Sequence, residues 1–439
     1  ALLQEMRDKK VQRFSVPMRK FAEEIGGDAV MMNTAAMAAS AGLVDYPLSF
    51  IEDIIRKNFA RKGDEIITGN LRVAEAAYNY AEKEYARGFD HKLEPIPNAP
   101  ERLLLSGNQA FGAGCIAGGL RWVSGYPMTP ATELLTYMSG KANAYDFVVK
   151  HTEDEIAAIC MATGAGHAGV RAMVPTSGGG FSLMVEGLGY AGCSETPVVI
   201  YLGQRPGPST GLPTRHEQGD LLFALFASQG DFPRTILTPG NIQECFEAGW
   251  RSLNLAEKYQ TPCIVISDTF LAISNQTADA SELDMDSVSI ERGKILSQAD
   301  VDALGRPYRR YEPADDGISP RTLPGLTNAV WVAEGNEHDA DSGISESIAD
   351  RNEQQHKRML KLEAARGEIK PPVVYGPEEA PNLLIGWGST LGPALEALKL
   401  LNKDRPTAQY CHMRELWPFP VDAVKEVLGR GQHVIDVEQ

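Results

Sequence analysis

Short, continuously apolar stretches alternate with longer helical patterns over the middle of the chain. A strand that helices cover on both faces has an unbroken apolar run, because neither face meets water. Alternation of such strands with helices is typical of an α/β domain with a parallel sheet. The predicted strands cover residues 102–105, 172–176, 197–202 and 262–268, and the predicted helices cover 111–122, 155–166, 181–191 and 242–259.

The regions on either side of this domain have other patterns. Toward the N-terminus, residues 29–34 predict a buried strand that ends at a helix cap, and residues 71–87 predict a helix. The proline-rich stretch 93–100 predicts an extended linker. Residues 278–376 are charged and polar and predict a long connection with one charged helix at 350–366.

A second α/β pattern begins at Asn382 and continues to the last residue. It predicts strands at 383–389, 408–413 and 434–439, with helices at 392–401 and 422–428 between them. The chain starts with Ala1-Leu2-Leu3 in a helical pattern and stops within a strand, so we expect both ends to be cut.

Composition and charge exclude several classes of protein. The formal charge of −16 argues against a nucleic-acid partner, which would need a basic face. No apolar run approaches the roughly 18–20 residues of a membrane span, so we expect no membrane association. The six cysteines form no Cys-x-x-Cys pair, which predicts no local zinc or iron–sulfur site and fits a reducing cytoplasm.

The stretch Ser124–Pro130 predicts a rigid loop that follows one helical pattern and precedes another. Pro127 and Pro130 fix the backbone on either side of Thr129, whose hydroxyl is thereby held in place. A stiff connection without chemistry is the alternative.

Two further candidates lie where a strand pattern meets a helix pattern. Glu153, Asp154 and Glu155 precede a nearly apolar helix, where they could be first-turn acids favoured by the helix dipole. An acid at the edge of a buried helix can also face a dry pocket in which its pKa is tuned. The sequence Thr176-Ser177-Gly178-Gly179-Gly180 predicts either a tight turn or backbone N–H groups that meet a ligand.

The stretch from Arg205 to Thr214 is rich in glycine, proline, serine and threonine around one cation. It follows a predicted strand at its carboxyl end, where open α/β sheets bind ligands. An arginine that is followed by a rigid proline is suited to bind a carboxylate through two hydrogen bonds. The interpretation we prefer is a ligand site.

Two patterns are weaker. Gly112-Ala113-Gly114 begins a loose dinucleotide pattern, but it lies a turn inside the predicted helix, so close helix packing is the better interpretation. The segment Glu337-His338-Asp339 could hold a hard cation, but it lacks the spacing of an EF-hand loop, and a capped, solvated turn is favoured.

Together these motifs resemble the α subunit of 2-oxoacid:ferredoxin oxidoreductases, most closely the 2-oxoglutarate type with a γ domain fused in front. The resemblance is strong from Gly107 onward and weak over residues 1–95. It is carried by Tyr126-Pro127-Met128-Thr129-Pro130, Glu153–Ala158, Thr176–Gly180 and Arg205–Thr214, with further likeness at Gly335–Gly343 and Leu416–Pro420.

The resemblance implies a fold class and four segments. Residues 1–95 would be the end of a γ-type domain, and residues 96–277 a pyrimidine-binding-like parallel-sheet domain of a thiamine-diphosphate enzyme. Residues 278–376 would connect it to a transketolase C-terminal-like α/β domain at 377–439, which is cut short.

It also implies an activity, cofactors and partners. The family decarboxylates a 2-oxoacid oxidatively to an acyl-CoA and passes electrons to ferredoxin, or runs in reverse. Thiamine diphosphate would be shared with a β subunit, which would hold Mg²⁺ and a [4Fe–4S] cluster, while this chain alone would bind no metal. A dimer of αβ heterodimers would form.

Residue by residue, Glu155 matches the acid that contacts the aminopyrimidine N1′, with Glu153 as the competing candidate. Tyr126, Pro127, Met128 and Thr129 match the loop beside the cofactor. Arg205 matches the arginine that grips the substrate carboxylate, and Thr214 and Thr129 match substrate-recognition hydroxyls. The family often has Ile at Met128 and Pro at Gly179. A non-catalytic assembly subunit and a transketolase-type enzyme without ferredoxin remain alternatives.

Overall fold

A computed structural model describes residues 6, 8–9, 11–100 and 102–439. The chain folds as two compact units, of which the first ends at Pro100 and the second continues to Gln439. The predicted helical stretch Ala1-Leu2-Leu3 lies outside the described residues. Each unit has its own hydrophobic core.

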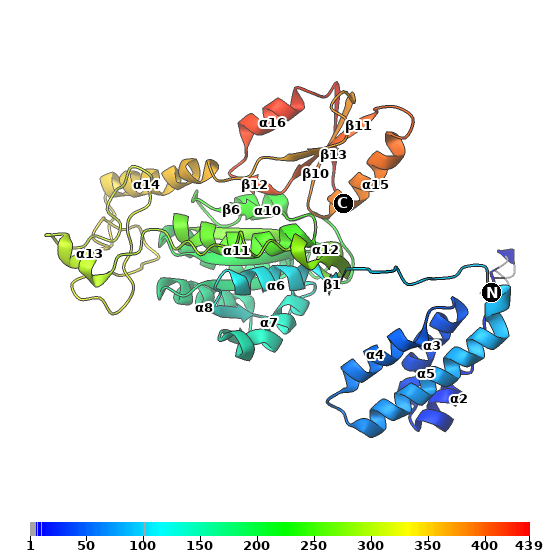
Figure 1. The fold of residues 1–439 in the computed structure, drawn as a ribbon. Coiled ribbons are helices and arrows are strands. Elements are labelled where there is room, and N and C mark those ends of the chain that lie inside the picture. The colour runs from blue at the N-terminus through cyan, green and yellow to red at the C-terminus, as the bar shows by residue number, and fades with distance from the viewer. Residues whose placement is uncertain (1–5, 7, 10, 101) are drawn as a thin grey trace. The chain divides into compact units, whose positions relative to one another are not determined.

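The first unit is helical over its described residues (Figure 1). The strand expected at residues 29–34 is wrong, because Val30 is exposed and the backbone coils from the cap at Asp28, whose carboxylate accepts a hydrogen bond from the Val30 N–H (2.9 Å). Gly42 allows close packing of two helices, since a Cβ there would lie 2.5 Å from the Tyr78 carbonyl oxygen. The α-helices of this unit are α2 (Met18–Phe21), α3 (Met32–Leu43), α4 (Leu48–Phe59) and α5 (Asp64–Tyr85), with a π-helical turn at Ala22–Gly26 and short 3-10 helices at Ala29–Met31 and Ala86–Gly88.

A seven-stranded sheet forms the centre of the second unit. Its strand order is β12-β6-β7-β5-β4-β2-β3, and every pair is parallel except β12 with β6. The α/β class with a parallel sheet is therefore confirmed. The strands are β2 (Trp122–Gly125), β3 (Val148–His151), β4 (Ala172–Thr176), β5 (Val198–Gln204), β6 (Thr235–Leu237), β7 (Pro262–Asp268) and β12 (Glu415–Trp417).

Helices cover both faces of this sheet, which explains the unbroken apolar strands. Along β5, Val199 and Tyr201 enter one core, and Val198, Ile200 and Leu202 enter the other. The first core is closed by α6 (Gly107–Ala117), α7 (Ala131–Tyr145) and α11 (Ile242–Tyr259), and the second by α8 (Glu155–His167), α9 (Gly178–Cys193) and α10 (Leu221–Phe226).

The helices α6 and α11 cross at glycines. A Cβ at Gly114 would lie 2.0 Å from the Phe246 carbonyl oxygen, and one at Gly249 would lie 2.4 Å from that of Phe111. The glycine pattern that loosely matches a dinucleotide-binding motif therefore allows close helix packing, as predicted.

Three predicted elements differ at the start of this unit. Residues 102–105 form β1 (Arg102–Leu105), but the strand is mostly exposed and pairs antiparallel with β8 (Gln276–Asp279) outside the main sheet. The helix expected at 111–122 starts and ends earlier, and β2 occupies its last predicted residue. The loop Ser124–Pro130 consequently overlaps the end of a strand rather than following a helix.

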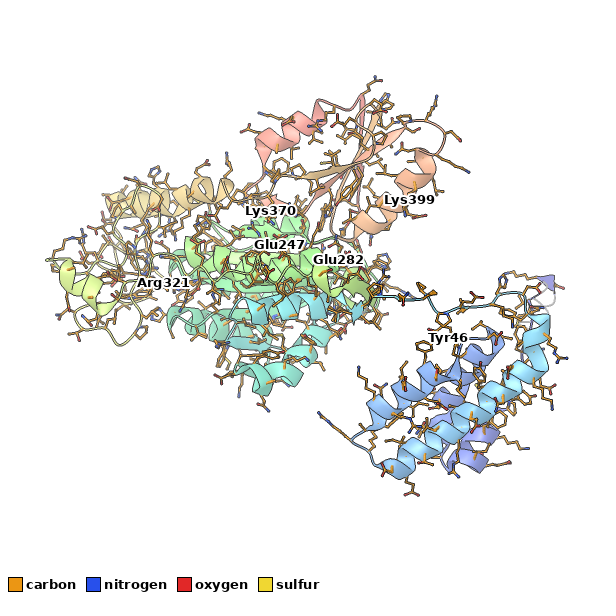
Figure 2. All side chains as sticks on the ribbon, viewed as in Figure 1. Tyr46, Glu247, Glu282, Arg321, Lys370 and Lys399 are labelled. Carbon is orange, nitrogen blue, oxygen red and sulfur yellow. The ribbon has the colours of Figure 1, made fainter. Side chains whose placement is uncertain are left out.

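The connecting region packs onto the sheet domain through buried charge as well as apolar contacts. It contains α13 (Gln298–Ala303) and the predicted charged helix α14 (Ile348–Arg366). Arg321, labelled in Figure 2, donates to the carboxylate of Glu257 (2.9 Å), and both side chains are buried. Short 3-10 helices lie at Ala280–Glu282 and Gly388–Thr390.

The last part of the chain forms a four-stranded sheet in the order β13-β10-β11-β9, in which only β9 is antiparallel. Lys370, just before this sheet, forms an ion pair with Glu247 of α11 (Figure 2). No helix among the described residues is long and apolar enough to cross a membrane. The elements are β9 (Val373–Tyr375), β10 (Asn382–Trp387), α15 (Leu391–Leu401), β11 (Ala408–Met413), α16 (Val421–Leu428) and β13 (His433–Val437), with α12 (Thr269–Ile273) after β7.

Candidate active site

The Tyr126–Pro130 loop leaves the carboxyl end of β2 and leads into α7. Tyr126 and Pro127 are exposed, Met128 and Thr129 are half-buried, and Pro130 is buried. The Pro130 carbonyl accepts a hydrogen bond from the side-chain amide of Asn108 (3.0 Å). The loop therefore has a fixed base and an open outer edge.

A second loop leaves β4 at the same edge of the sheet and opens α9. The Gly180 N–H donates to the Met128 sulfur (3.3 Å), which joins this turn to the first loop. Ser177 is fully buried, and its hydroxyl has no hydrogen-bond partner among the described residues. Gly180 has to be a glycine, because a Cβ there would lie 2.2 Å from the Thr176 hydroxyl and 2.5 Å from the carboxylate of Glu155.

Glu155 is the first residue of α8 and is 3% exposed. One of its carboxylate oxygens, Oε1, is buried and has no hydrogen-bond partner within the described part of the chain. Burial raises the pKa of this carboxyl above its ordinary value, against a smaller opposing effect of a backbone hydrogen bond. Burial thus favours the protonated form of this carboxyl more than water would.

The two acids that precede Glu155 have different surroundings. Asp154 is the N-cap of α8, and its carboxylate accepts a hydrogen bond from the Ala157 N–H (2.7 Å). Glu153 is exposed. Of the three acids, only Glu155 has the dry environment that the functional interpretation requires.

Arg205 follows β5 and connects to the first loop. Its Nη1 donates to the carbonyl of Thr129 (2.8 Å), and the side chain is half-buried. Burial lowers the pKa of the guanidinium below its ordinary value. The loop turns back at Gly211, whose φ is +55° and where a Cβ would lie 1.7 Å from the Pro206 carbonyl oxygen.

These loops surround one open hollow of about 520 Å³. Three of the four motifs contribute to its lining, and Glu155 packs behind it against Gly180. The lining residues are Met128, Gly178, Gly179, Ser182, Arg205, Gly207, Pro208, Ser209, Thr210, Asp220 and Phe223.

Thr214 does not lie among the lining residues. It is exposed on the outer part of its loop, and the neighbouring Thr210 lines the hollow instead. Tyr126 and Thr129 are also outside the lining, although Thr129 contacts Arg205 through its backbone.

The sequence interpretation did not single out Asp220, which lines the hollow. Burial, together with the neighbouring Glu217, raises the pKa of its carboxyl to about 6. A Cβ added at Gly178 would lie 2.8 Å from one of its carboxylate oxygens. Its position as the N-cap before the apolar run of α10 was the available signal.

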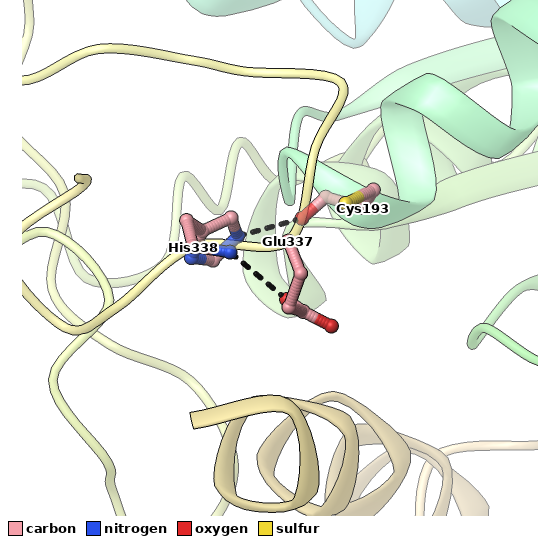
Figure 3. Close-up of side chains that lie close together, drawn as sticks. All are labelled: Cys193, Glu337 and His338. Atoms are coloured by element: carbon pink, nitrogen blue, oxygen red, sulfur yellow. Dashed lines mark hydrogen bonds between the residues drawn. The ribbon is translucent and has the colours of Figure 1, made fainter. Parts of the chain in front are cut away.

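Figure 3 shows Glu337 and His338, from the segment 337–339, beside Cys193. Glu337, His338 and Cys193 approach one another closely enough to be considered as metal ligands. However, both Glu337 oxygens accept from arginines, Arg358 and Arg351 (2.7–2.9 Å), and the His338 Nε2 faces the Cys193 carbonyl oxygen (3.2 Å). The Asp339 Oδ1 caps the turn, as predicted, by accepting from the N–H groups of Asp341 (2.9 Å) and Gly343 (2.8 Å). The prediction that the turn is solvated is wrong at His338, which is fully buried.

Two family models match the chain. Residues 113–355 match the model described as pyruvate flavodoxin/ferredoxin oxidoreductase, thiamine diphosphate-binding. Residues 2–80 match the model described as pyruvate ferredoxin/flavodoxin oxidoreductase. The first match contains the three motifs that line the hollow and the motif of Glu155.

Curated relatives cover most of this chain. The 2-oxoacid:ferredoxin oxidoreductase 1, subunit alpha, of Sulfurisphaera tokodaii is 39% identical over 411 residues, which is 90% of this chain and 62% of the relative. The 2-oxoglutarate synthase subunit KorA of Methanothermobacter thermautotrophicus is 32% identical over 339 residues, which is 77% of this chain and 88% of the relative. The chain thus spans less than two thirds of the length of the Sulfurisphaera protein.

A solved structure matches the fold. It is the 2-oxoglutarate:ferredoxin oxidoreductase from Magnetococcus marinus with 2-oxoglutarate, coenzyme A and succinyl-CoA bound, and it is 34% identical with a TM-score of 0.87. The match covers 97% of this chain and 73% of that one. The chain belongs to the family of 2-oxoacid:ferredoxin oxidoreductase alpha subunits.

Proposed function

We propose that this chain is the α subunit of an enzyme that converts a 2-oxoacid, CoA and oxidised ferredoxin to acyl-CoA, CO₂ and reduced ferredoxin, with 2-oxoglutarate as the substrate. The observation that carries the proposal is the half-buried Arg205 in a hollow lined by three of the family motifs. The choice of 2-oxoglutarate is supported by the named substrates of the Methanothermobacter relative and the Magnetococcus structure.

The residues present fit thiamine diphosphate. Glu155 offers a buried, unpartnered carboxylate oxygen, burial raises the pKa of this carboxyl, and Gly180 lets the carboxylate pack directly against the backbone of α9. The bound cofactor would supply the carbanion chemistry that decarboxylation needs. Glu155 would share a proton with the N1′ atom of the aminopyrimidine and thereby hold the ring in its basic tautomer.

Arg205 would bind the carboxylate next to the oxo group. Its Nη1 is fixed by the Thr129 carbonyl, and within the described part of the chain its Nε and Nη2 have no protein partner. A guanidinium with two unpaired N–H groups can bind a carboxylate through two parallel hydrogen bonds, because the spacing of the two nitrogens matches that of the two oxygens. The glycine amides of the α9 turn and Thr210 would complete the polar lining, with Thr129 and Thr214 as further substrate-recognition groups.

The diphosphate, its Mg²⁺ and a [4Fe–4S] cluster would lie on a β subunit, in a dimer of αβ heterodimers. A reducing compartment such as the cytoplasm suits this chemistry. All six cysteines of this chain are free, and four of them are buried.

The test is viologen or ferredoxin reduction by the α chain copurified with its β subunit. We expect activity that depends on both CoA and 2-oxoglutarate and is lower with pyruvate or branched oxoacids. Arg205→Ala should lower kcat/KM for the oxoacid by about 10- to 100-fold, because charge-assisted bonds of about 1.5–3 kcal/mol are lost.

Arg215→Ala is the matched control, since Arg215 is an exposed arginine on the same loop. Equal kinetics for Arg205→Ala and wild type would remove the substrate role from Arg205. Oxoacid turnover without electron transfer would favour the transketolase-type alternative, and an α-independent β activity would favour an assembly subunit.

A further inference from the structure

The segment that carries Arg205 and Thr214 is a long loop between β5 and α10, which we call loop 205–220. Residues 207–212 and 214–216 are largely exposed or half-exposed, so few packing contacts hold the outer part in place. Long exposed loops sample many backbone conformations unless hydrogen bonds fix them. The contacts at the base of this loop therefore decide how well its functional groups are positioned.

One buried glutamine closes the base of the loop within the sheet domain. Gln204 is fully buried, and its Oε1 accepts from the Asp220 N–H (3.0 Å). Its Nε2 donates to the Ser267 carbonyl at the end of β7 (3.2 Å). The two ends of loop 205–220 are thereby tied to each other and to the neighbouring strand.

A second buried glutamine ties the loop to the other sheet. Gln218 is 5% exposed, and its Nε2 donates to the carbonyl of Trp387, the last residue of β10 (2.9 Å). Its Oε1 accepts from the Gln439 N–H (3.1 Å), and its own N–H donates to the Gln439 carbonyl (2.9 Å). Since Gln439 follows β13, one residue of the loop bridges the carboxyl ends of two paired strands, β10 and β13.

Gly388, which follows β10, leaves room for the side-chain amide of Gln218. Gly388 has φ +61°, and a Cβ there would lie 2.7 Å from the Gln218 Nε2. A larger residue at 388 would have both a strained backbone and no room beside the amide. The contact thus depends on residues from both sheets.

We propose that Gln218 is a positioning residue that couples the strand ends of the C-terminal sheet to loop 205–220 and so aligns Arg205 and Thr210 with the hollow. The part concerning substrate alignment rests on the proposed function, whereas the coupling of loop and sheet does not. Gln218 does not line the hollow, so it would act on the substrate through loop 205–220.

Limited proteolysis of the full chain tests the coupling without any assay of activity. The bond after Arg215 is the tryptic site within the loop, because Arg205 is followed by a proline and trypsin does not cleave there. Gln218→Leu keeps the volume of the side chain and removes both side-chain hydrogen bonds. We expect cleavage after Arg215, followed by mass spectrometry, to be about tenfold faster than in wild type.

Gln409→Leu is the matched control. Gln409 is a fully buried glutamine of the same C-terminal sheet, and its amide donates to the carbonyls of Glu378 and Ala380 (3.0 Å each), away from the loop. It loses comparable bonds and should leave cleavage after Arg215 unchanged. Gly388→Ala perturbs the Gln218 amide from the other side and should also accelerate cleavage.

Equal cleavage rates in wild type and both variants of the contact would overturn the proposal, as would equal acceleration in Gln409→Leu. In the αβ complex, Gln218→Leu should raise KM for the oxoacid about tenfold and leave KM for ferredoxin unchanged. If wild type itself has no oxoacid activity, the proposed function fails, while the proteolysis result still decides the coupling of loop and sheet.

Discussion

Two glutamates near the start of α8 are close in sequence but have different surroundings. Glu155 is buried with a free oxygen, and Glu153 is exposed. In the αβ complex, Glu155→Gln should lower turnover by about 10²–10⁴-fold, because proton transfer at the cofactor would lose its acid. Glu153→Gln should change turnover little.

Viologen reduction measures the effect, and thiamine diphosphate content after gel filtration checks that the cofactor is still bound. A large loss in Glu153→Gln with normal turnover in Glu155→Gln would reverse the assignment of the two acids.

The raised pKa of Asp220 predicts that this residue contributes to the free energy of unfolding in a pH-dependent way. Burial raises its pKa from 3.8 to about 6, so the folded chain binds a proton more tightly than the unfolded chain. The contribution of Asp220 to the free energy of unfolding is therefore largest below about pH 4, and it is lost as the pH rises through about 6. Asp220→Asn should stabilise the protein by about 1–2 kcal/mol at pH 8, after allowance for partial exposure, and hardly at pH 4.

Urea unfolding at the two pH values measures the difference. If Asp220→Asn raised the free energy of unfolding equally at pH 4 and pH 8, the carboxylate charge would not be the cause of the stabilisation.

At the scale of elements, the crossing of α6 and α11 depends on Gly114. An alanine there would bring its Cβ to within 2.0 Å of the Phe246 carbonyl oxygen, so the helices would have to separate. We expect Gly114→Ala to destabilise the protein by about 2–3 kcal/mol, at the upper end of the usual range for overpacking. Thermal unfolding with calorimetry measures the change.

Gly164→Ala is the control for this prediction. Gly164 lies in α8, where an added Cβ would meet no atom within 4 Å, so helix propensity alone should stabilise the protein by about 0.5–1 kcal/mol. Equal effects of the two substitutions would contradict the packing role of Gly114.

At the scale of the molecule, a buried ion network attaches the connecting region to the sheet domain. Glu195 follows α9 and lies 2.7 Å from the Lys357 Nζ and 2.5 Å from the Lys361 Nζ, both on α14. Burial alone would raise the pKa of Glu195, but the two lysines and Arg310 hold it far below its ordinary range. The region that the sequence predicts as a connection is thus an integral part of the second unit.

Glu195→Gln would leave two lysines buried without a counter-charge. We expect a loss of about 3–5 kcal/mol in the free energy of unfolding, measured by urea denaturation, with faster hydrogen exchange in α14. Glu363→Gln, at an exposed acid of the same helix, should change stability by less than about 0.5 kcal/mol. Similar losses in both variants would argue against the network.

The sequence alone determined the elements whose pattern is local and strong. The strand β11 and the helix α11 were predicted with the bounds that the structure has. The strands β2 and β3 were missed, because each has only four residues and β3 is an exposed edge strand. The order of four motifs was sufficient to indicate the family, since motif order is a property of the sequence.

Only the tertiary structure decided which candidate groups are buried together. The Glu155 carboxylate packs against Gly180 of α9, and the exposure of Thr214 depends on the path of its loop. The contact between Gln218 and Gln439 joins residues 221 positions apart. The periodicity of a sequence indicates which face of a helix or strand is apolar. It does not indicate which distant residues contact each other, because those contacts depend on how the helices and strands pack.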